Sequence, residues 1–248
     1  MNINNKTILI TGAASGLGAA TARELSKRGA NTILLDRNAE AAKQVSAEIN
    51  GVAFECDVTA ETSVKNVLSQ CNEIHATINC AGIVYGARIV GKNGAMPLDD
   101  FSRVLQINLI GTFNVMRLVA EKMSAQNPVN DIGERGVIIN TASVAAFEGQ
   151  LGQVAYSASK GGIVAMTLPA ARELSKFGIR VMTIAPGVMQ TPMMAGMTAE
   201  IQESLAADIP FPKKLGDPKH FGELCVHIIE NSYLNGETIR LDGALRLK

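Results

Sequence analysis

The chain has 248 residues, of which 47% are hydrophobic and 4% aromatic, and it contains no Trp. That length is enough to bury one large core, and a core of Ala, Val, Ile and Leu is typical of parallel α/β packing. Because 23 Lys and Arg balance 23 Asp and Glu, the charge argues against nucleic acid as the main partner.

Short apolar runs alternate with stretches of helical periodicity along the whole chain. The runs predict strands at 6–11, 31–35, 52–56, 75–80, 135–142, 179–184 and 237–241. The periodic stretches predict helices at 16–28, 38–50, 60–72, 98–125, 152–177 and 217–230, whereas 83–97 and 185–216 read as irregular. This alternation predicts an α/β fold of the Rossmann type, one domain over residues 1–248. We expect about seven strands in a doubly wound parallel sheet, helices on both faces, and a lid at about 188–213.

The cysteines and histidines form no metal-binding pattern. The four cysteines contain no C-x-x-C pair, and His220 and His227 have no third ligand nearby. We therefore expect no metal and interpret the cysteines as reduced, buried thiols. No apolar run reaches the ~18 residues of a membrane span. Because MNINN leads directly into a strand, we expect no targeting peptide and an intracellular protein, cytoplasmic or, in a eukaryote, in the mitochondrial matrix.

The turn after the first strand reads T-G-A-A-S-G-L-G. Its glycines, Gly12, Gly16 and Gly18, allow a tight turn, a close approach to a pyrophosphate, and packing of the next helix on the strand. Ser15 and the amide of Leu17 can donate hydrogen bonds to phosphate at the start of that helix. Since a strand precedes the turn and a helix follows it, the motif predicts a dinucleotide site.

Asp36 ends the second strand, eighteen residues beyond Gly18. A carboxylate there accepts hydrogen bonds from ribose hydroxyls and repels a 2′-phosphate, which favours NAD over NADP. The adjacent Arg37 softens this preference. The alternative role for Asp36, capping the next helix, is weak because Asn38 already fills it.

Further candidate contacts follow the third and fourth strands. We expect Asp57 and Val58 to receive the adenine, and the small residues around Cys80 and Gly82 to let the backbone pass close to the second ribose. By themselves, these segments would be ordinary turns between a strand and a helix.

Tyr156 and Lys160 are four residues apart in a predicted helix, so their side chains leave the same face. A free phenol titrates near pH ~10, and a close ammonium is expected to lower that pKa so that the phenol can serve as a base. Ser143 follows a strand thirteen residues upstream, where it can hydrogen-bond the same substrate oxygen. Taken alone, the pair would be an ordinary surface Tyr and Lys.

Together, T-G-x-x-x-G-x-G, N-x-A-G, Asn108 in INLIGTF, Ser143, Y-x-x-x-K and PG at 186–187 resemble the short-chain dehydrogenase/reductase family over the whole chain. In that family an Asn–Ser–Tyr–Lys tetrad forms the active site, which implies catalytic roles for Asn108, Ser143, Tyr156 and Lys160. The family usually has N-N-A-G, and here Cys80 replaces the second Asn. The contact at this position is expected through the backbone.

Longer segments, among them GERGVIINTASVAAFEGQ and NGETIRLDGA, resemble the type II (short-chain) 3-hydroxyacyl-CoA dehydrogenases. This resemblance implies oxidation of a 3-hydroxyacyl-CoA or related secondary alcohol with NAD, and a homotetramer. It implies a substrate contact at Ser143. It weakens at 85–97 and 193–209. The cofactor contacts it implies are Ser15, Leu17, Asp36, Asp57, Val58, Cys80, Tyr156, Lys160, Met189 and Thr191.

The mechanism implied has Tyr156 taking the hydroxyl proton while hydride leaves the substrate. Ser143 holds the substrate oxygen, Lys160 lowers the pKa of the phenol, and Asn108 supports a water path. An alternative role for Asn108 is an amide inside a helix that binds only backbone. We expect Thr191 to meet the nicotinamide carboxamide. Four methionines form either an adaptable acyl-chain wall or ordinary core: Met189, Met193, Met194 and Met197.

Two rival functions remain open at this stage. One is an NADPH-dependent 3-oxoacyl-thioester (acyl-carrier-protein) reductase, against which Asp36 argues. The other is a catalytically idle NAD-binding scaffold or redox sensor, against which the complete tetrad argues. Gly161 and Gly162 in mid-helix cost roughly 1 kcal/mol each relative to Ala, so we expect that helix to pack closely against another element.

Overall fold

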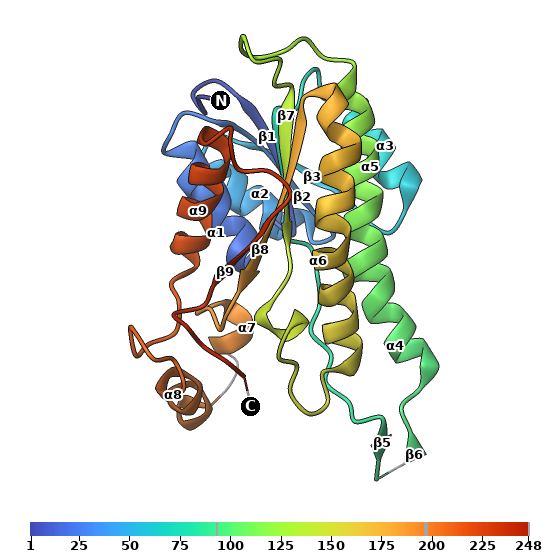
Figure 1. Cartoon of the computed structure of the whole chain (residues 1–248), viewed down its shortest axis with the longest axis vertical. Coiled ribbons are helices and arrows are strands. Elements are labelled where there is room, and N and C mark those ends of the chain that lie inside the picture. The colour runs from blue at the N-terminus through green and yellow to red at the C-terminus, as the bar shows by residue number, and fades with distance from the viewer. Residues whose placement is uncertain (93, 196–197, 248) are drawn as a thin grey trace.

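The computed structural model describes residues 1–92, 94–195 and 198–247. Within these residues, seven parallel strands form one sheet in the order β3-β2-β1-β4-β7-β8-β9 (Figure 1). The order reverses between β1 and β4, which is the switch point of a doubly wound sheet. The predicted Rossmann fold is therefore confirmed. The strands are β1 (Thr7–Thr11), β2 (Asn31–Asp36), β3 (Val52–Glu55), β4 (Ala76–Asn79), β7 (Gly136–Thr141), β8 (Ile179–Pro186) and β9 (Thr238–Leu241).

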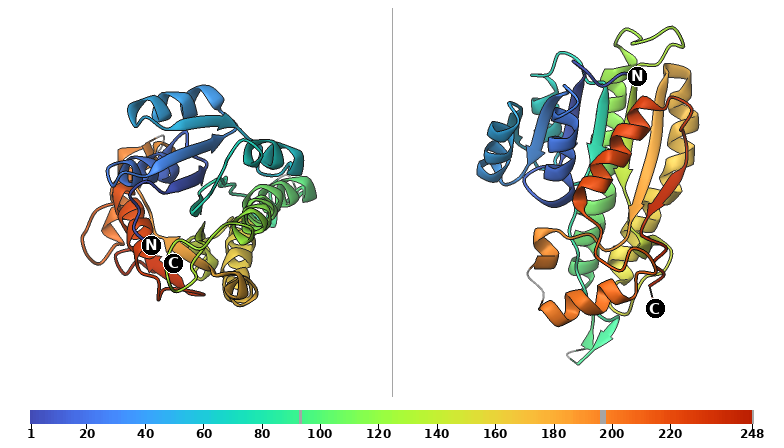
Figure 2. Two further views of the ribbon diagram at one scale, coloured as in Figure 1. Left: turned by 90° about the horizontal axis from the view of Figure 1, so that it is seen from above. Right: turned by 90° about the vertical axis from the view of Figure 1, so that its left-hand side faces the viewer.

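Helices cover both faces of the sheet (Figure 2). Because side chains alternate along a strand, Ile8 and Ile10 of β1 face one core while Leu9 faces the other. One core is closed by α1 (Gly16–Ser26), α2 (Ala39–Glu48) and α9 (Pro218–Glu230). The other is closed by α3 (Glu61–Leu68), α5 (Gly111–Ser124) and α6 (Val154–Leu174).

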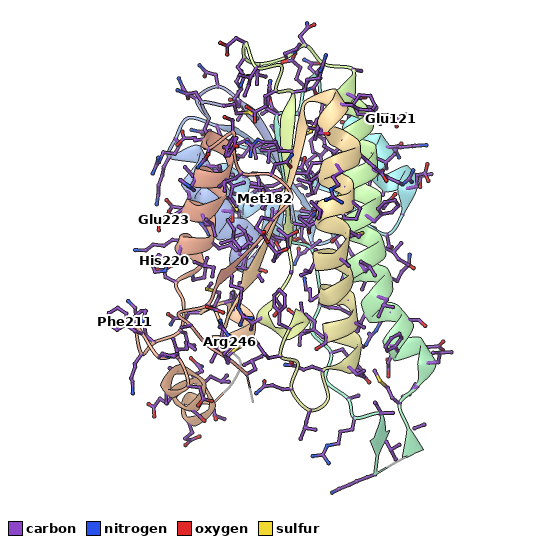
Figure 3. The ribbon with its side chains drawn as sticks, in the orientation of Figure 1. Glu121, Met182, Phe211, His220, Glu223 and Arg246 are labelled. Carbon is purple, nitrogen blue, oxygen red and sulfur yellow. The ribbon has the colours of Figure 1, made fainter. Side chains whose placement is uncertain are left out.

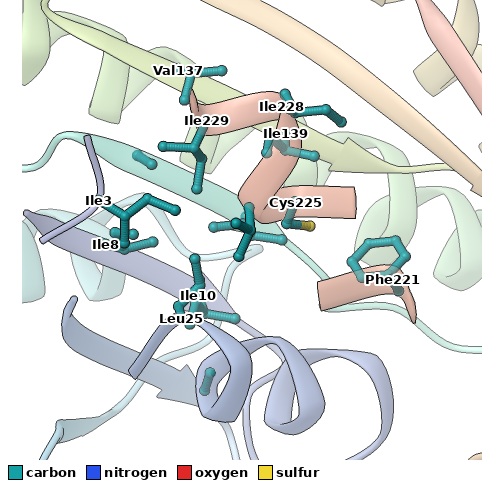
Figure 4. Packing of buried hydrophobic residues seen from close by; sticks show 14 of the residues in the cluster. Ile3, Ile8, Ile10, Leu25, Val137, Ile139, Phe221, Cys225, Ile228 and Ile229 are labelled. Atoms are coloured by element: carbon teal, nitrogen blue, oxygen red, sulfur yellow. The ribbon is translucent and has the colours of Figure 1, made fainter. Parts of the chain in front are cut away.

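The first core shows how α9 is held against the sheet (Figure 4). Phe221 and Ile228 of α9 are fully buried, and α1 is packed beside α9. Burial of such side chains is worth roughly 1.5–3 kcal/mol each. The ends of the central strands are therefore held firmly in place.

The long helix predicted at 98–125 is found over 98–124, but its centre is π-helical rather than α-helical. α4 (Leu98–Leu105) gives way to a π-helical turn at Gln106–Ile110 before α5 begins. Asn108 lies in the middle of this turn. Hydrophobic periodicity continues through a single π-turn, so the sequence pattern does not reveal it, and such turns are frequent at functional sites.

Two segments predicted as irregular contain regular structure. The segment 83–97 holds a small antiparallel hairpin of β5 (Val90–Gly91) and β6 (Gly94–Ala95). The segment 185–216 holds α7 (Pro192–Ala195) and α8 (Ala199–Ala207). Figure 1 shows these elements and the end of the chain at the same end of the molecule, beyond the carboxyl ends of the strands.

The close packing expected of the mid-helix glycines is found within the chain. A Cβ on Gly162 would lie 2.8 Å from a methyl carbon of Leu109, in the π-helical turn, whereas Gly161 has nearly open space. Gly162 therefore lets α6 approach that turn. None of the described helices is both long and apolar enough to cross a membrane.

Candidate active site

A cleft of about 580 Å³ opens where the carboxyl ends of the strands meet. It is lined by every residue predicted to contact cofactor or substrate, drawn from segments far apart in the sequence. Asn108 does not line it and lies behind its wall. The lining residues that were predicted are Gly12, Ser15, Gly16, Leu17, Gly18, Asp36, Asp57, Val58, Cys80, Gly82, Ser143, Tyr156, Lys160, Met189 and Thr191.

The floor of the cleft is bare backbone. Gly12 has φ +62°, and a Cβ there would lie 2.7 Å from the backbone nitrogen of Ala81. A Cβ on Gly18 would lie 2.2 Å from the carbonyl oxygen of Gly12. The backbone amides of Cys80 and Ala81 both donate to the Thr11 hydroxyl at 3.1 Å. The turns after β1 and β4 are thus held together through the Thr11 hydroxyl, with no room for a side chain at Gly12.

The start of α1 suits an anion. Ser15 occupies the position before the helix in extended conformation, and its side chain does not cap the first amides of α1. Gly16 has φ +54°, and the Thr191 side chain lies 3.6 Å from where its Cβ would be. The uncapped amides and the Ser15 hydroxyl fit a pyrophosphate, because a helix start offers N–H donors and partial positive charge.

Asp36 is fixed at the end of β2. Its two carboxylate oxygens accept backbone hydrogen bonds from Ala14 at 3.0 Å and Asn38 at 2.9 Å. Each oxygen keeps a further lone pair for a ribose hydroxyl. Asn38 caps α2 by accepting from the Ala41 amide at 3.1 Å, so Asp36 is not needed as the cap of that helix.

Asp57 follows β3, which pairs with β2, so Asp36 and Asp57 stand on neighbouring strands at one end of the cleft. A hydrogen bond from the Thr59 hydroxyl, 2.7 Å from Oδ1, holds the pKa of Asp57 below its usual value. The Arg37 guanidinium Nε lies 4.0 Å from the other oxygen. This end of the cleft therefore carries two carboxylates and a single exposed guanidinium.

Ser143 and Tyr156 meet at the other end of the cleft. Ser143 follows β7 and begins a short 3₁₀ helix at 144–146, where its Oγ accepts the Ala145 amide at 3.1 Å. The Ser143 side chain also lies close enough to the Tyr156 hydroxyl to lower the pKa of that phenol. Two hydroxyl groups thus converge on one position, as expected for groups that hold the same substrate oxygen.

Burial governs the pKa values of Tyr156 and Lys160. Burial raises the pKa of Tyr156, and the hydrogen bond from Ser143 lowers it only in part. Lys160 Nζ lies 5.7 Å from the tyrosine ring centroid and donates to the Thr141 carbonyl at 2.7 Å. Burial lowers the pKa of Lys160 itself to about 8. In the chain alone, desolvation is the main influence on the pKa of both groups, and the lowering of the phenol's pKa by Lys160 stays a prediction.

Asn108 joins three elements behind the cleft. It is fully buried, and its side chain exchanges two hydrogen bonds with the backbone of Ile83, at 2.8 and 2.9 Å. Its amide also lies 3.1 Å from the Ser159 hydroxyl. A Cβ on Gly82 would lie 3.1 Å from the Asn108 oxygen and 3.7 Å from Lys160 Nζ. The π-helical turn thus places Asn108 next to the lysine.

Several lining residues were missed by sequence reasoning. Gln150 and Gln153 lie between Ser143 and Tyr156 in the sequence. That position between two predicted catalytic residues could have identified them as lining residues. Leu205 and Leu247 come from α8 and from the segment after β9, and no motif marks them. Of the four methionines, Met189 and Met194 line the cleft; Met197 and the Met193 side chain lie outside the described residues.

Cys80 also lines the cleft. Burial raises the pKa of its thiol to about 12, so it stays protonated. Cys56, Cys71 and Cys225 are buried free thiols.

Comparisons with known proteins agree with this geometry. The sequence model of the short chain dehydrogenases matches residues 6–202. The 3-hydroxyacyl-CoA dehydrogenase type-2 of Bos taurus is 51% identical, over 100% of this chain and 97% of that protein. The crystal structure of 3-hydroxyacyl-CoA dehydrogenase type-2 from Mycobacterium avium superposes with a TM-score of 0.94 at 39% identity, covering 98% and 97% of the two chains.

More distant relatives share the architecture. The 3-oxoacyl-[acyl-carrier-protein] reductase FabG of Thermotoga maritima is 33% identical over 99% of each chain. The family model and the relatives matched over their full length identify the same family. The Ser143 and Tyr156 hydroxyls beside the glycine-lined cleft agree with that assignment. The chain belongs to the short chain dehydrogenase family, whose members are oxidoreductases that use a nicotinamide cofactor.

Proposed function

We propose that this protein oxidises 3-hydroxyacyl-CoA to 3-oxoacyl-CoA with NAD, and that Tyr156 is the general base. The observation that carries the proposal is the convergence of the Ser143 and Tyr156 hydroxyls in the cleft that also holds the glycine turn and Asp36. The relatives with about half of their residues identical to this chain bear that activity in their names.

NAD, when bound, would supply the hydride acceptor, and the residues that would hold it are the uncapped start of α1, Asp36 and Thr191. Ser143 would hold the substrate oxygen, and Tyr156 would receive the proton of the hydroxyl. The fixed hydroxyl of Ser143 would stabilise the charge that develops on the substrate oxygen. The positive charge of oxidised nicotinamide would favour the ionised phenol, whose pKa is raised in the chain alone.

Lys160 and Asn108 would support that proton transfer. Lys160 is 5% exposed and anchored to the Thr141 carbonyl, so its charge is held at a fixed place beside the phenol. Asn108 fixes the backbone at Ile83, next to Gly82 and Lys160. We propose that this arrangement keeps a path open for the proton to leave towards solvent, the role suggested by the family tetrad.

The preference for NAD rests on charge at the nucleotide end of the cleft. A 2′-phosphate would approach Asp36, whose carboxylate is held in place by two backbone amides. The nearest cation, Arg37, is exposed and lies 4.0 Å from Asp57. Like-charge repulsion at Asp36 therefore disfavours NADP.

The substrate end of the cleft suits an acyl chain. Its described lining includes Val188, Met194, Leu205 and Leu247, and thioether and leucine side chains adapt to an apolar ligand. The segment 188–213 frames this region, and we propose that it acts as the lid.

A panel of 3-hydroxyacyl-CoA substrates tests the proposal, with formation of NADH or NADPH followed by absorbance. We expect oxidation with NAD and a much lower kcat/KM with NADP. Faster reduction of 3-oxoacyl-thioesters with NADPH would instead establish the reductase. Binding of NADH without turnover of any acyl-CoA or simple secondary alcohol would favour the idle scaffold.

We also propose a homotetramer. Ile110 at the end of the π-helical turn, Phe113 of α5 and Leu168 of α6 are between 45% and 48% exposed, and Figure 1 shows α5 and α6 side by side. An exposed apolar face on paired helices is typical of a subunit interface. Light scattering coupled to size-exclusion chromatography measures the mass; a monomer of 26.2 kDa would contradict this assembly.

A further inference from the structure

A cluster of four charged residues ties together the walls of the substrate end of the cleft. We call Glu148, Arg240, Asp242 and Arg246 the Arg240 cluster. Arg240 donates to both oxygens of Glu148 at 2.8 Å, which is the bidentate arrangement that gives an arginine–carboxylate pair both strength and direction. Arg246, seen in Figure 3 beside the last part of the chain, adds a bond to Asp242 at 3.1 Å.

One side of the cluster is the loop that carries the catalytic serine. Glu148 follows the 3₁₀ helix that Ser143 begins, and its amide donates to the Val144 carbonyl at 3.0 Å. The Arg240 guanidinium carbon also lies 5.1 Å from the centroid of the Phe147 ring. Two residues later, Gln150 lines the cleft. The hydrogen bonds to Glu148 therefore restrain the loop 143–150, and both ends of this loop line the cleft.

The other side is the segment after β9. Arg240 Nε donates to Asp242 at 2.8 Å, and Nη2 donates to the Leu245 carbonyl at 3.1 Å. Leu245 is 1% exposed, and Leu247, two residues on, lines the cleft. A single guanidinium thus fixes the path of the chain on both sides of the apolar end of the cleft.

The surroundings make these bonds stronger than ordinary surface pairs. The side chains of Arg240 and Glu148 are 22% and 26% exposed, and that of Asp242 is 8% exposed. Partial burial reduces screening by water, and a network of charges in ideal geometry is the case in which ion pairs matter. None of the four residues of the Arg240 cluster lines the cleft itself.

We propose that Arg240 is a positioning residue for the alcohol substrate. Through Glu148 and the Leu245 carbonyl, it holds the Ser143 loop against the wall that Leu247 provides. As a result, the space between the Ser143 loop and Leu247, where the acyl chain would bind, has a fixed width. This inference rests on the proposed function in that the substrate is an acyl thioester with a 3-hydroxyl group.

Glu148→Gln tests the proposal with the least disturbance, since it keeps the shape of the side chain and removes the charge. We expect KM for a 3-hydroxyacyl-CoA of medium chain length to rise about tenfold, the equivalent of one charge-assisted hydrogen bond. We expect kcat to change less than threefold and NADH affinity, measured by fluorescence titration, to stay at the wild-type value.

Variants of Arg240 test whether the change in KM follows the Arg240–Glu148 linkage. Arg240→Met should raise the same KM by at least as much as Glu148→Gln, and Arg240→Lys should recover part of the loss because it restores the charge. The double variant Glu148→Gln with Arg240→Met should be no worse than Arg240→Met alone, because both changes break one linkage.

Glu48→Gln is the matched control. It breaks a more exposed arginine–carboxylate pair, Arg23 Nε to Glu48 at 2.8 Å, and neither of these two residues lines the cleft. We expect wild-type kinetics from it. An equal rise of KM in Glu48→Gln, or a Glu148→Gln enzyme with wild-type KM, would overturn the positioning role. Wild-type protein that oxidises no acyl thioester while binding NADH normally would sink the proposed function instead.

Discussion

The two ends of the cleft are built in different ways. The nucleotide end is made of the turns that directly follow β1, β2 and β4, and its contacts are backbone amides, a fixed carboxylate and bare glycines. The substrate end is made of α8, the loop after Ser143 and the segment after β9, and the Arg240 cluster joins the last two of these. The comparison suggests that cofactor binding is tied to the fold itself, whereas substrate choice depends on linkages that can change without altering the sheet.

We expect the largest effect from Tyr156→Phe, which changes the reacting position where the two ends of the cleft meet. Loss of the only ionisable group on that side chain should lower kcat by about 10²–10⁴-fold, the usual contribution of general acid–base catalysis. NADH affinity should persist, because the nucleotide end is untouched. Tyr233→Phe is the control, since Tyr233 is 99% exposed. Near-wild-type turnover by the Tyr156 variant would refute its role as base.

Lys160→Met tests how much the burial of the lysine charge lowers the free energy of unfolding. Burial lowers the pKa of Lys160 to about 8 from 10.5 in the unfolded chain, a difference worth about 3 kcal/mol. The unfolded state binds more protons between these two values, so the wild type gains stability as pH rises through that window.

The measurement for this variant is the difference in free energy of unfolding between Lys160→Met and wild type, by urea denaturation at several pH values. We expect the difference to move in favour of the wild type between pH 8 and 10. A difference that is flat across this range would show that Lys160 is not a desolvated cation in the free protein.

Asp36→Ala tests whether the nucleotide end selects its cofactor by charge. Removing the carboxylate deletes charge-assisted hydrogen bonds worth about 1.5–3 kcal/mol and also the repulsion of a 2′-phosphate. We expect kcat/KM with NAD to fall about tenfold to a hundredfold and the ratio of NADP to NAD use to rise. Asp99→Ala, an exposed change outside the cleft lining, is the control. An unchanged ratio would contradict the assignment.

A pair of glycine variants compares the crowded floor of the nucleotide end with an open position outside the cleft lining, Gly86. A Cβ on Gly18 would lie 2.2 Å from a backbone oxygen, whereas a Cβ on Gly86 would meet nothing within 4 Å. Gly18→Ala should therefore destabilise the fold by about 1–3 kcal/mol and weaken NADH binding. Gly86→Ala should change neither. Thermal unfolding and NADH titration measure both, and equal tolerance at the two positions would break the comparison.

The sequence predicted the nucleotide end well because its signals are local. A glycine turn between a strand and a helix, and an acid at the next strand end, are fixed by short-range geometry. The same holds for Tyr156 and Lys160, whose four-residue spacing in α6 puts them on one face. All of these residues line the cleft where they were expected.

Features that depend on distant partners were not predicted. The π-helical turn at Asn108 is favoured by hydrogen bonds to Ile83, twenty-five residues away, and apolar periodicity carries no trace of it. Leu247 lines the cleft close in sequence to Arg240, which binds Glu148 across ninety-two residues. The raised pKa of Tyr156 likewise reflects burial by the whole fold, whereas the sequence showed only its charged neighbour.

In the mechanism proposed, hydride leaves the hydroxyl-bearing carbon at the position where Ser143 and Tyr156 meet. A single-turnover experiment with 3-hydroxybutyryl-CoA deuterated at C3 tests it most directly, with the recovered nicotinamide cofactor analysed by mass spectrometry. We expect deuterium in the reduced cofactor at the rate of product formation, and a Tyr156→Phe enzyme slowed by at least about a hundredfold. Unlabelled reduced cofactor, or transfer at an undiminished rate in that variant, would contradict the account.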